Sequence, residues 1–218
     1  NWKKAERWDD RTLYTLERDA FGFCLTGDMF DSYRVEARNF SIPFKDVRDS
    51  REQQTIAGIV QSVRTIAGKR GTFAVVALSD GQTTMDVLVF AKAYENYKNM
   101  LKPDEMLIFT GKGRKDERSG GMSFVCDKAI TIEEMRVSRG ATLLIEVSDG
   151  VALESLSQVL RKAQSSDIGT VSCEVSLLSQ SKRAELTLNH RYVPSDDLIN
   201  QMRGVEGVVS VKYSYEGM

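Results

Sequence analysis

The sequence has little of the chemistry that metal centres and disulfide scaffolds need. Its 218 residues include three cysteines, one histidine and three prolines, and no two cysteines are close enough to form a Cys-x-x-Cys pair. Because zinc sites draw mainly on cysteine and histidine, a zinc centre is not expected. An odd number of isolated thiols fits a reducing compartment better than a disulfide framework. We therefore expect a cytoplasmic protein that holds no cofactor or metal in this chain.

Long hydrophobic runs and a net charge are also missing. Apolar stretches such as Phe73–Leu78 and Val87–Ala91 are far shorter than the roughly 18–20 residues that cross a bilayer. The 30 basic and 31 acidic side chains nearly cancel, so attraction to nucleic acid would have to come from local clusters. No membrane span is expected. The chain begins at Asn1 without a leader, which indicates a piece of a longer protein.

Residues 1–52 are expected to form a helical lead-in followed by a linker. Apolar side chains recur every three to five residues between Ala5 and Phe23, which is the spacing of an amphipathic helix. Asp28 is a suitable N-cap for a second, short helix that runs to Arg38. The residues that follow carry alternating charge without a period, as is typical of a linker.

Residues 53–135 alternate like β-strands, with one helical interruption. The expected strands are 55–66, 72–78, 83–90, 105–112 and 122–132, and the expected helix is 91–101. Five strands with a helix between the third and the fourth predict an OB-fold, which is a partly open β-barrel. The helix is the informative element, because up-and-down and SH3-like barrels do not require one there.

Residues 142–218 show the order β-α-β-β-α-β, with helices expected at 151–164 and 195–203. This order is that of a split βαβ, or ferredoxin-like, domain. The predicted fold class is therefore α+β: a helical lead-in, an OB-fold β-barrel, and a β-α-β-β-α-β ferredoxin-like domain.

No set of catalytic residues is recognisable in the sequence. It contains no nucleophile with a neighbouring base, no cluster of metal ligands and no G-x-x-x-x-G-K-[ST] phosphate loop. Hairpin turns account for the glycine-rich segments, and helix capping accounts for the pair Asp196-Asp197. We therefore expect no catalytic residue in this chain.

Two clusters of basic residues are the candidates for a binding site. Lys69 and Arg70 lie between the first two expected strands, and Arg114, Lys115 and Arg118 lie between the last two. In an OB-fold these two loops flank the face that binds oligonucleotides, so the five cations would surround one groove. The alternative is that they are ordinary solvated hairpin tips.

Aromatic side chains could supply the stacking surface of such a groove. Four phenylalanines lie in the expected strands: Phe73, Phe90, Phe109 and Phe124. Phe73 follows the first basic loop and is the best candidate to stack on a base, although a place in the barrel core is also open. Phe109 has apolar neighbours on both sides in the sequence and is expected in the core.

Several of these segments resemble a known family. The stretch Leu16–Gly27, LERDAFGFCLTG, is similar to the E-x-E-A-L-G-x-Y-L-(S/T)-G-H-P signature that precedes the OB domain in the alpha subunit of bacterial DNA polymerase III. Gly58–Gly71, Val87–Glu95 and Asp116–Gly121 are similar to strand and loop motifs of that OB domain, in the same order. Leu143–Tyr213 resembles the family's C-terminal domain through weaker motifs.

The chain departs from the family signature at one place. Asp28-Met29 stands where His-Pro is usual, so the turn at this point is expected to differ from that of the family.

The resemblance implies the C-terminal, non-catalytic portion of a replicative DNA polymerase, an enzyme that extends primers from deoxynucleoside triphosphates and uses Mg²⁺. It implies that the OB domain contacts single-stranded template DNA and that the C-terminal domain binds the tau subunit of the clamp loader. The sliding clamp would bind the parent subunit outside this chain. The catalytic carboxylates of the family also lie upstream, so this segment is expected to be inactive alone.

Two aromatic residues near the end of the chain are the expected contacts for the tau subunit. Tyr213 and Tyr215 lie at the end of the last expected strand, where exposed aromatic side chains often anchor interfaces. For Tyr213 a core position is equally compatible with the pattern.

A different class of function fits the same elements. A stand-alone regulatory protein could use its OB-fold to form oligomers and its C-terminal unit to bind a small ligand. A reading frame that starts near Asn1 would favour this alternative.

Overall fold

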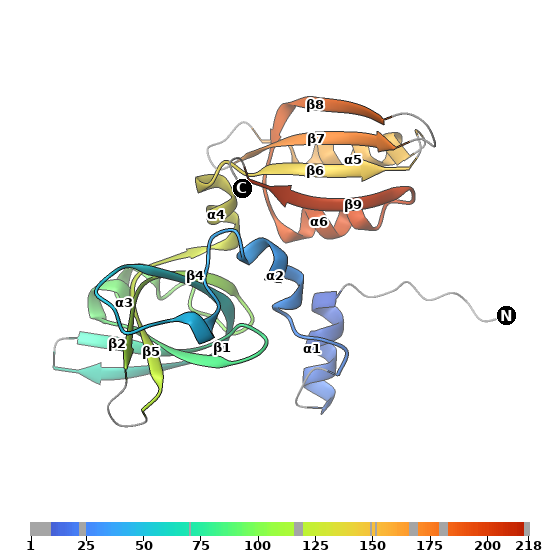
Figure 1. Ribbon diagram of the computed structural model, residues 1–218. Coiled ribbons are helices and arrows are strands. Elements are labelled where there is room, and N and C mark those ends of the chain that lie inside the picture. Colours follow the sequence, from blue (N-terminus) through green and yellow to red (C-terminus); the bar gives the residue numbers. More distant parts are fainter. Residues whose placement is uncertain are drawn as a thin grey trace. The chain divides into compact units, whose positions relative to one another are not determined.

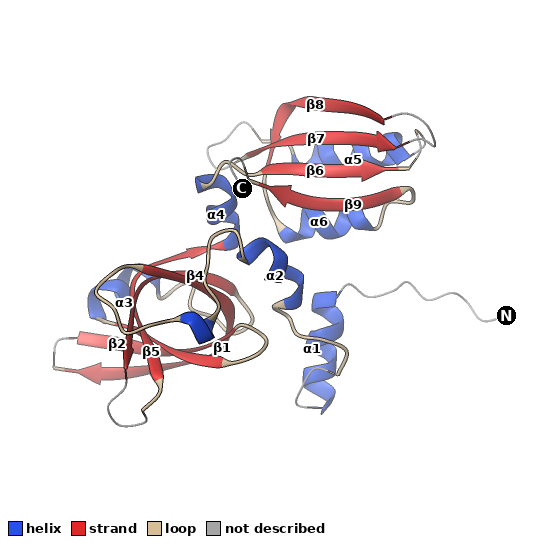
Figure 2. Ribbon diagram, viewed as in Figure 1, coloured by secondary structure: helices blue, strands red, loops and turns tan. Residues whose placement is uncertain are grey.

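The computed structural model describes residues 10–21, 25–69, 71–115, 120–148, 150, 152–165, 170–178 and 183–215 (Figures 1 and 2). The chain divides into two compact units, Asn1–Thr131 and Ile132–Met218. Parts of the expected first helix, two of the five loop cations (Arg70 and Arg118) and Cys24 lie outside the described residues.

Two helices come before the strands of the first unit: α1 (Asp10–Phe21) and α2 (Asp31–Ala37). The buried carboxylate of Glu17 in α1 accepts hydrogen bonds from the backbone N–H groups of Leu25, at 2.6 Å, and Thr26, at 3.0 Å. These bonds hold the chain that leaves α1 against the helix.

The expected role of Asp28 as a helix N-cap is wrong. Helix α2 begins at Asp31, and Phe30 occupies the cap position without a side-chain capping bond. Instead, the Asp28 carboxylate accepts the N–H of Phe30, two residues further along the chain, at 2.8 Å. This bond forms an Asx turn ahead of the helix.

Five strands of the first unit form a closed barrel in the order β1-β2-β3-β5-β4. Neighbouring strands are antiparallel except β3 and β5, which are parallel. The strands are β1 (Gln54–Gly68), β2 (Gly71–Ser79), β3 (Thr84–Val89), β4 (Met106–Lys115) and β5 (Met122–Thr131). Helix α3 (Ala91–Tyr97) lies between β3 and β4, as an OB-fold requires. The expected barrel is confirmed.

The barrel core is built from alternate residues of the strands. Val76, Val87, Phe109 and Phe124 are completely buried, so the core position expected for Phe109 is confirmed. Helix α3 packs against this core through partly buried aromatic and apolar side chains, which closes one end of the barrel.

The second unit begins with α4 (Ile132–Ser138), a helix that the sequence pattern did not predict. A four-stranded sheet follows, with α5 and α6 on the same face (Figure 2). Its elements are β6 (Thr142–Val147), α5 (Ala152–Ala163), β7 (Val171–Leu178), β8 (Arg183–Tyr192), α6 (Asp196–Arg203) and β9 (Val208–Ser214).

The sheet has the order β8-β7-β6-β9, and this contradicts the ferredoxin-like arrangement. A split βαβ needs a strand between the two strands that its first helix connects, whereas β6 and β7 are direct parallel neighbours. The expected order of elements was correct, but the expected sheet was wrong. Within the described part of the chain, no helix has the length and apolar character needed to cross a membrane.

Candidate nucleic-acid interface

The outer surface of the barrel carries an apolar patch beside the β1–β2 hairpin. Side chains that pair across strands share a face, and Ile66 pairs with Phe73 on the face opposite the core. The ring of Phe73 lies 6.0 Å from that of Phe90, measured between centroids. Phe73 is half-buried, whereas Phe90 is 49% and Ile66 is 44% exposed. We call these three residues the apolar platform.

The next row of the same face has apolar residues in the middle and a cation at each end. The register runs from Arg64 to Val75, Leu88, Val125 and Lys112 across all five strands. Val75 is buried and the two central side chains on β3 and β5 are partly exposed, while Arg64 is exposed and Lys112 half-buried. This row is therefore an apolar floor between two positive charges.

A third row limits the site. Here Ala77 pairs with Asp86, Asp86 pairs with Ser123, and Ser123 pairs with Arg114. The exposed carboxylate of Asp86 makes the middle of this row unfavourable for an anion, although Arg114 supplies a cation at its β4 end, so the surface best suited to nucleic acid lies toward the β1–β2 hairpin.

The structure tests part of the basic groove expected from the sequence. Lys69 lies at the tip of the β1–β2 hairpin, and Arg114 and Lys115 lie at the end of β4; all three are exposed. Among the described residues, none of the three has an ion-pair partner. Their charges are thus available to a ligand.

The register adds two residues that the sequence pattern had missed, Arg64 and Lys112, which flank the apolar floor. Phe90, one of the four phenylalanines named from the sequence, completes the stacking surface through its ring contact with Phe73. Alternation alone shows that Arg64 and Ile66 share a face, but it does not show which face. That assignment needs the pairing of Ile66 with Phe73 and the burial of their neighbours.

Tyr213 and Tyr215 of the second unit are not exposed, so the core position left open for Tyr213 is confirmed and the exposure expected of Tyr215 is wrong. Their exposed fractions are 8% and 7%. Tyr213 pairs with the buried Leu143 on the face that the helices cover, and the guanidinium of Arg136 lies 4.3 Å from its ring centroid. Among the described strand residues of this unit, the large apolar side chains that are exposed are Leu186 and Val209.

The described residues contain no group of three histidine, cysteine or carboxylate side chains that could hold a metal ion. Two cysteines in the described segments, Cys126 and Cys173, are free and buried. Neither contributes to the outer face of the barrel.

Comparison with known proteins places this geometry in context. Residues 54–137 match the family described as OB-fold nucleic acid binding domain. Over 224 residues the chain is 26% identical to DNA polymerase III subunit alpha of Escherichia coli (strain K12), a match that covers 99% of this chain and 19% of that protein. The corresponding subunit of Vibrio cholerae serotype O1 is 27% identical over 224 residues, covering 98% and 19%.

A third relative and one solved structure are also similar to parts of the chain. DNA polymerase III subunit alpha of Neisseria meningitidis serogroup B is 25% identical over 215 residues, which cover 97% of this chain and 19% of that protein. RecG bound to a three-way DNA junction is similar over 37% of this chain and 11% of its own, at 20% identity and a TM-score of 0.31, which is too low to add to the assignment.

The chain therefore spans about a fifth of the length of the curated relatives it matches. Along almost all of its own length it is similar to the alpha subunit of bacterial DNA polymerase III, and it contains an OB-fold nucleic acid binding domain at residues 54–137.

Proposed function

We propose that the barrel binds single-stranded DNA across its outer face, as part of the alpha subunit of a bacterial replicative polymerase. The observation that carries the proposal is the apolar platform of Ile66, Phe73 and Phe90, beside which Arg64 and Lys69 form no ion pair with any described residue. Single-strand sites combine these two features, because bases stack on aromatic rings while cations follow the phosphates.

Binding of this kind has little sequence preference. Every base has a π-face that can stack on Phe73 or Phe90, and phosphate contacts carry no sequence information. The site thus fits a polymerase, which must accept any template. Primer extension itself, with Mg²⁺, belongs to the parent subunit in this proposal, and the present chain would be inactive alone.

The proposal predicts a measurable salt dependence. A variant with Lys69, Arg114 and Lys115 changed to Gln should lose about 0.7 per removed phosphate contact from the slope of log affinity against log salt. Fluorescence anisotropy with an oligothymidylate over a salt series measures this slope. Changing Arg161 and Lys162, two exposed cations in α5, to Gln is the control and should leave the slope unchanged. Wild-type slope and affinity in the triple variant would contradict the groove assignment.

Stacking can be tested separately from charge. Replacing Phe73 or Phe90 with Ala should weaken binding by roughly 1–3 kcal/mol if a base stacks there. The same variants are melted in parallel, because a loss of affinity together with an unfolded barrel would say nothing about stacking. Unchanged affinity in a folded Phe73→Ala/Phe90→Ala double variant would exclude the platform as a binding surface.

For the second unit we propose binding to the tau subunit of the clamp loader, on the ground of the resemblance and of its exposed apolar side chains. Leu186 and Val209, which are 52% and 60% exposed, are the contacts we propose in place of the buried tyrosines. Leu186→Asp and Val209→Asp in the 218-residue chain should reduce capture by purified tau, whereas Val35→Asp on α2 serves as the control. Undiminished capture by both variants would move the contact elsewhere.

A further inference from the structure

A second positively charged site lies in the first unit, away from the outer face just described. Arg34 in α2, Arg38 directly after it, and Lys45 in the short 3-10 helix Phe44–Asp46 line a pocket of about 140 Å³. Its other walls include the ring of Phe30 and the turn between β2 and β3, which contains Asp80. We call it the α2 pocket.

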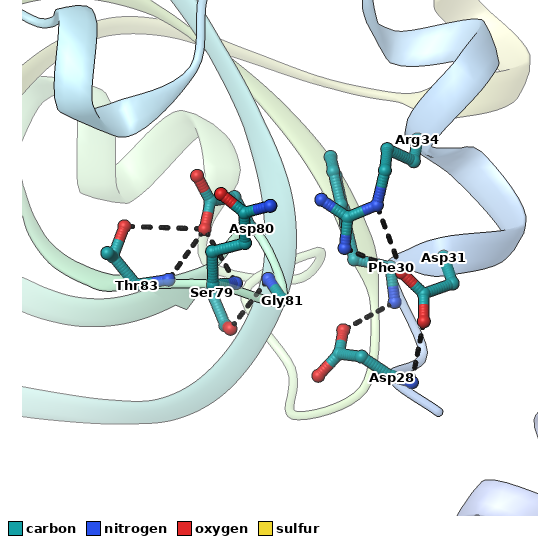
Figure 3. Close-up of polar contacts among 9 residues, drawn as sticks. Asp28, Phe30, Asp31, Arg34, Ser79, Asp80, Gly81 and Thr83 are labelled. Carbon is teal, nitrogen blue, oxygen red and sulfur yellow. Dashed lines mark hydrogen bonds and ion pairs between the residues drawn. The ribbon is translucent and has the colours of Figure 1, made fainter. Parts of the chain in front are cut away.

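Arg34 is held in place within this pocket. Its Nε and Nη2 donate to one carboxylate oxygen of Asp31, at 3.0 and 2.6 Å, and its guanidinium lies 5.5 Å from the ring centroid of Phe30. Figure 3 shows this group beside Phe30 and Asp31, with the turn that carries Asp80 and Gly81 opposite. Nη1 makes no hydrogen bond to a described residue. An arginine oriented in this way presents a donor without a further loss of side-chain freedom.

The other two cations have no partner of their own. Within the described segments, neither Arg38 nor Lys45 forms an ion pair, and both side chains are exposed. They come from two different parts of the chain and line one pocket. Two uncompensated charges beside a fixed guanidinium favour an anion that can accept several hydrogen bonds.

The carboxylate in the pocket wall is occupied by the protein. One oxygen of Asp80 accepts the N–H groups of Gln82, at 3.0 Å, and Thr83, at 2.8 Å. Its other oxygen accepts the N–H of Phe44 at 3.4 Å. These bonds fix Asp80 in the turn and offset part of its charge. Because Asp31 already pairs with Arg34, Arg38 and Lys45 are the two cations that outweigh this one engaged carboxylate.

We propose that the α2 pocket binds a phosphate group. Phosphate fits because it is compact, carries up to two negative charges and accepts hydrogen bonds from guanidinium and ammonium groups together. A phosphodiester of single-stranded DNA and the phosphates of a free nucleotide share this chemistry. The proposal does not depend on DNA binding at the apolar platform, because the pocket and the platform share no residue.

The test follows amide signals of the ¹⁵N-labelled 218-residue chain while a ligand is added. The probes are inorganic phosphate, a deoxynucleoside triphosphate and an oligothymidylate, with sodium chloride at equal ionic strength as the blank. We expect saturable shifts at Ser41 and Gln82, which line the pocket. Saturation by the oligonucleotide alone identifies nucleic acid as the source of the phosphate, and saturation by the triphosphate identifies a free nucleotide.

Arg38→Ala/Lys45→Ala should weaken that saturation by about tenfold or more, since each removed cation takes a charge-assisted hydrogen bond with it. Both side chains are exposed, so the melting temperature should not change. The matched control is Arg161→Ala/Lys162→Ala in α5.

Shifts that fail to saturate with every probe, or that are equal in the double variant and the wild type, would overturn the proposal. The triple variant at Lys69, Arg114 and Lys115 separates the two sites. It should retain the shifts at Ser41 and Gln82 even if DNA binding at the barrel face proves absent.

Discussion

At the scale of single residues, Gly81 shows how one position joins α2 to the barrel. Its φ is +78°, a region that glycine enters without strain. An added Cβ would lie 2.7 Å from Nη2 of Arg34 and 2.9 Å from Oδ1 of Asp28. The backbone conformation therefore favours glycine, and an added Cβ would force the ends of the Arg34 and Asp28 side chains to shift.

Gly81→Ala should cost about 1–2 kcal/mol of backbone strain and should also displace Arg34. Gly120→Ala is the matched control, because Gly120 has a φ of +71° but no atom within 4 Å of an added Cβ. Chemical denaturation of both variants measures the free energy of unfolding. The difference between the two losses separates the effect of backbone strain from that of the contact with Arg34. If the Gly81 variant loses no more stability than the Gly120 variant, the close approach to Arg34 does not contribute to the free energy of unfolding.

The buried cysteines give a prediction about pH. Burial, with a smaller contribution from neighbouring carboxylates, raises the pKa of Cys126 and of Cys173 to about 12. In the unfolded chain a thiol ionises near pH 8.5, so above that pH the unfolded state releases protons that the native state keeps. The free energy of unfolding should therefore fall as the pH rises from about 9 toward 12.

The matching measurement is alkylation at about pH 8, read by peptide mass spectrometry. Both cysteines should stay unmodified in the native protein and react readily in urea, because the thiolate is the reactive species. Rapid native-state alkylation of Cys126 or Cys173 would contradict their burial.

At the scale of elements, α4 is tied to the rest of the second unit by one buried arginine. Arg136 is 1% exposed; its Nη1 donates to the backbone oxygen of Pro194 and to Asp196, both at 2.8 Å. Its guanidinium also lies over the ring of Tyr213. One side chain of α4 thus contacts the start of α6 and strand β9.

Asp196→Ala should destabilise the unit by about 3–5 kcal/mol, because it leaves a buried charge without this carboxylate. Arg136→Met should cost less, since it removes the charge and keeps most of the volume. Urea denaturation of both variants gives the comparison. A smaller loss for Asp196→Ala than for Arg136→Met would contradict the view that the buried charge dominates.

The positions of the strands and helices along the chain were largely predictable from periodicity. Which strands lie side by side in a sheet was not. The expected strand at 72–78 differs from β2 by one residue at each end, and the expected helix at 195–203 differs from α6 by one. Alternation and capping are local, so they mark such elements well. The order β8-β7-β6-β9 depends on contacts between distant segments, which a local pattern does not contain.

The same limit applies to the candidate site. Hairpin loops could be found from sequence, which identified Lys69, Arg114 and Lys115. The outer face could not, because Arg64 and Lys112 join it only through the pairing of strands, and Phe90 joins it through its ring contact with Phe73. The buried tyrosines were misplaced for a related reason: the face on which Tyr213 lies is set by its register with Leu143.

At the scale of the whole molecule, the chain consists of two compact units with different surfaces. The first presents aromatic and cationic side chains on the outside of a closed barrel, and the second presents a sheet with α5 and α6 on one face (Figure 2). Similarity to polymerase alpha subunits extends over both units. The central claim is that single-stranded DNA lies on the outer face of the barrel, in contact with Phe73 and Phe90.

Ultraviolet cross-linking of the 218-residue chain to an oligonucleotide that carries 4-thiothymidine, followed by peptide mass spectrometry, tests this claim most directly. Stacked bases cross-link to the rings they touch, so we predict adducts at Phe73 and Phe90, and their loss when unlabelled oligonucleotide competes. Competable adducts confined to residues 132–218, with none on the barrel, would contradict the account.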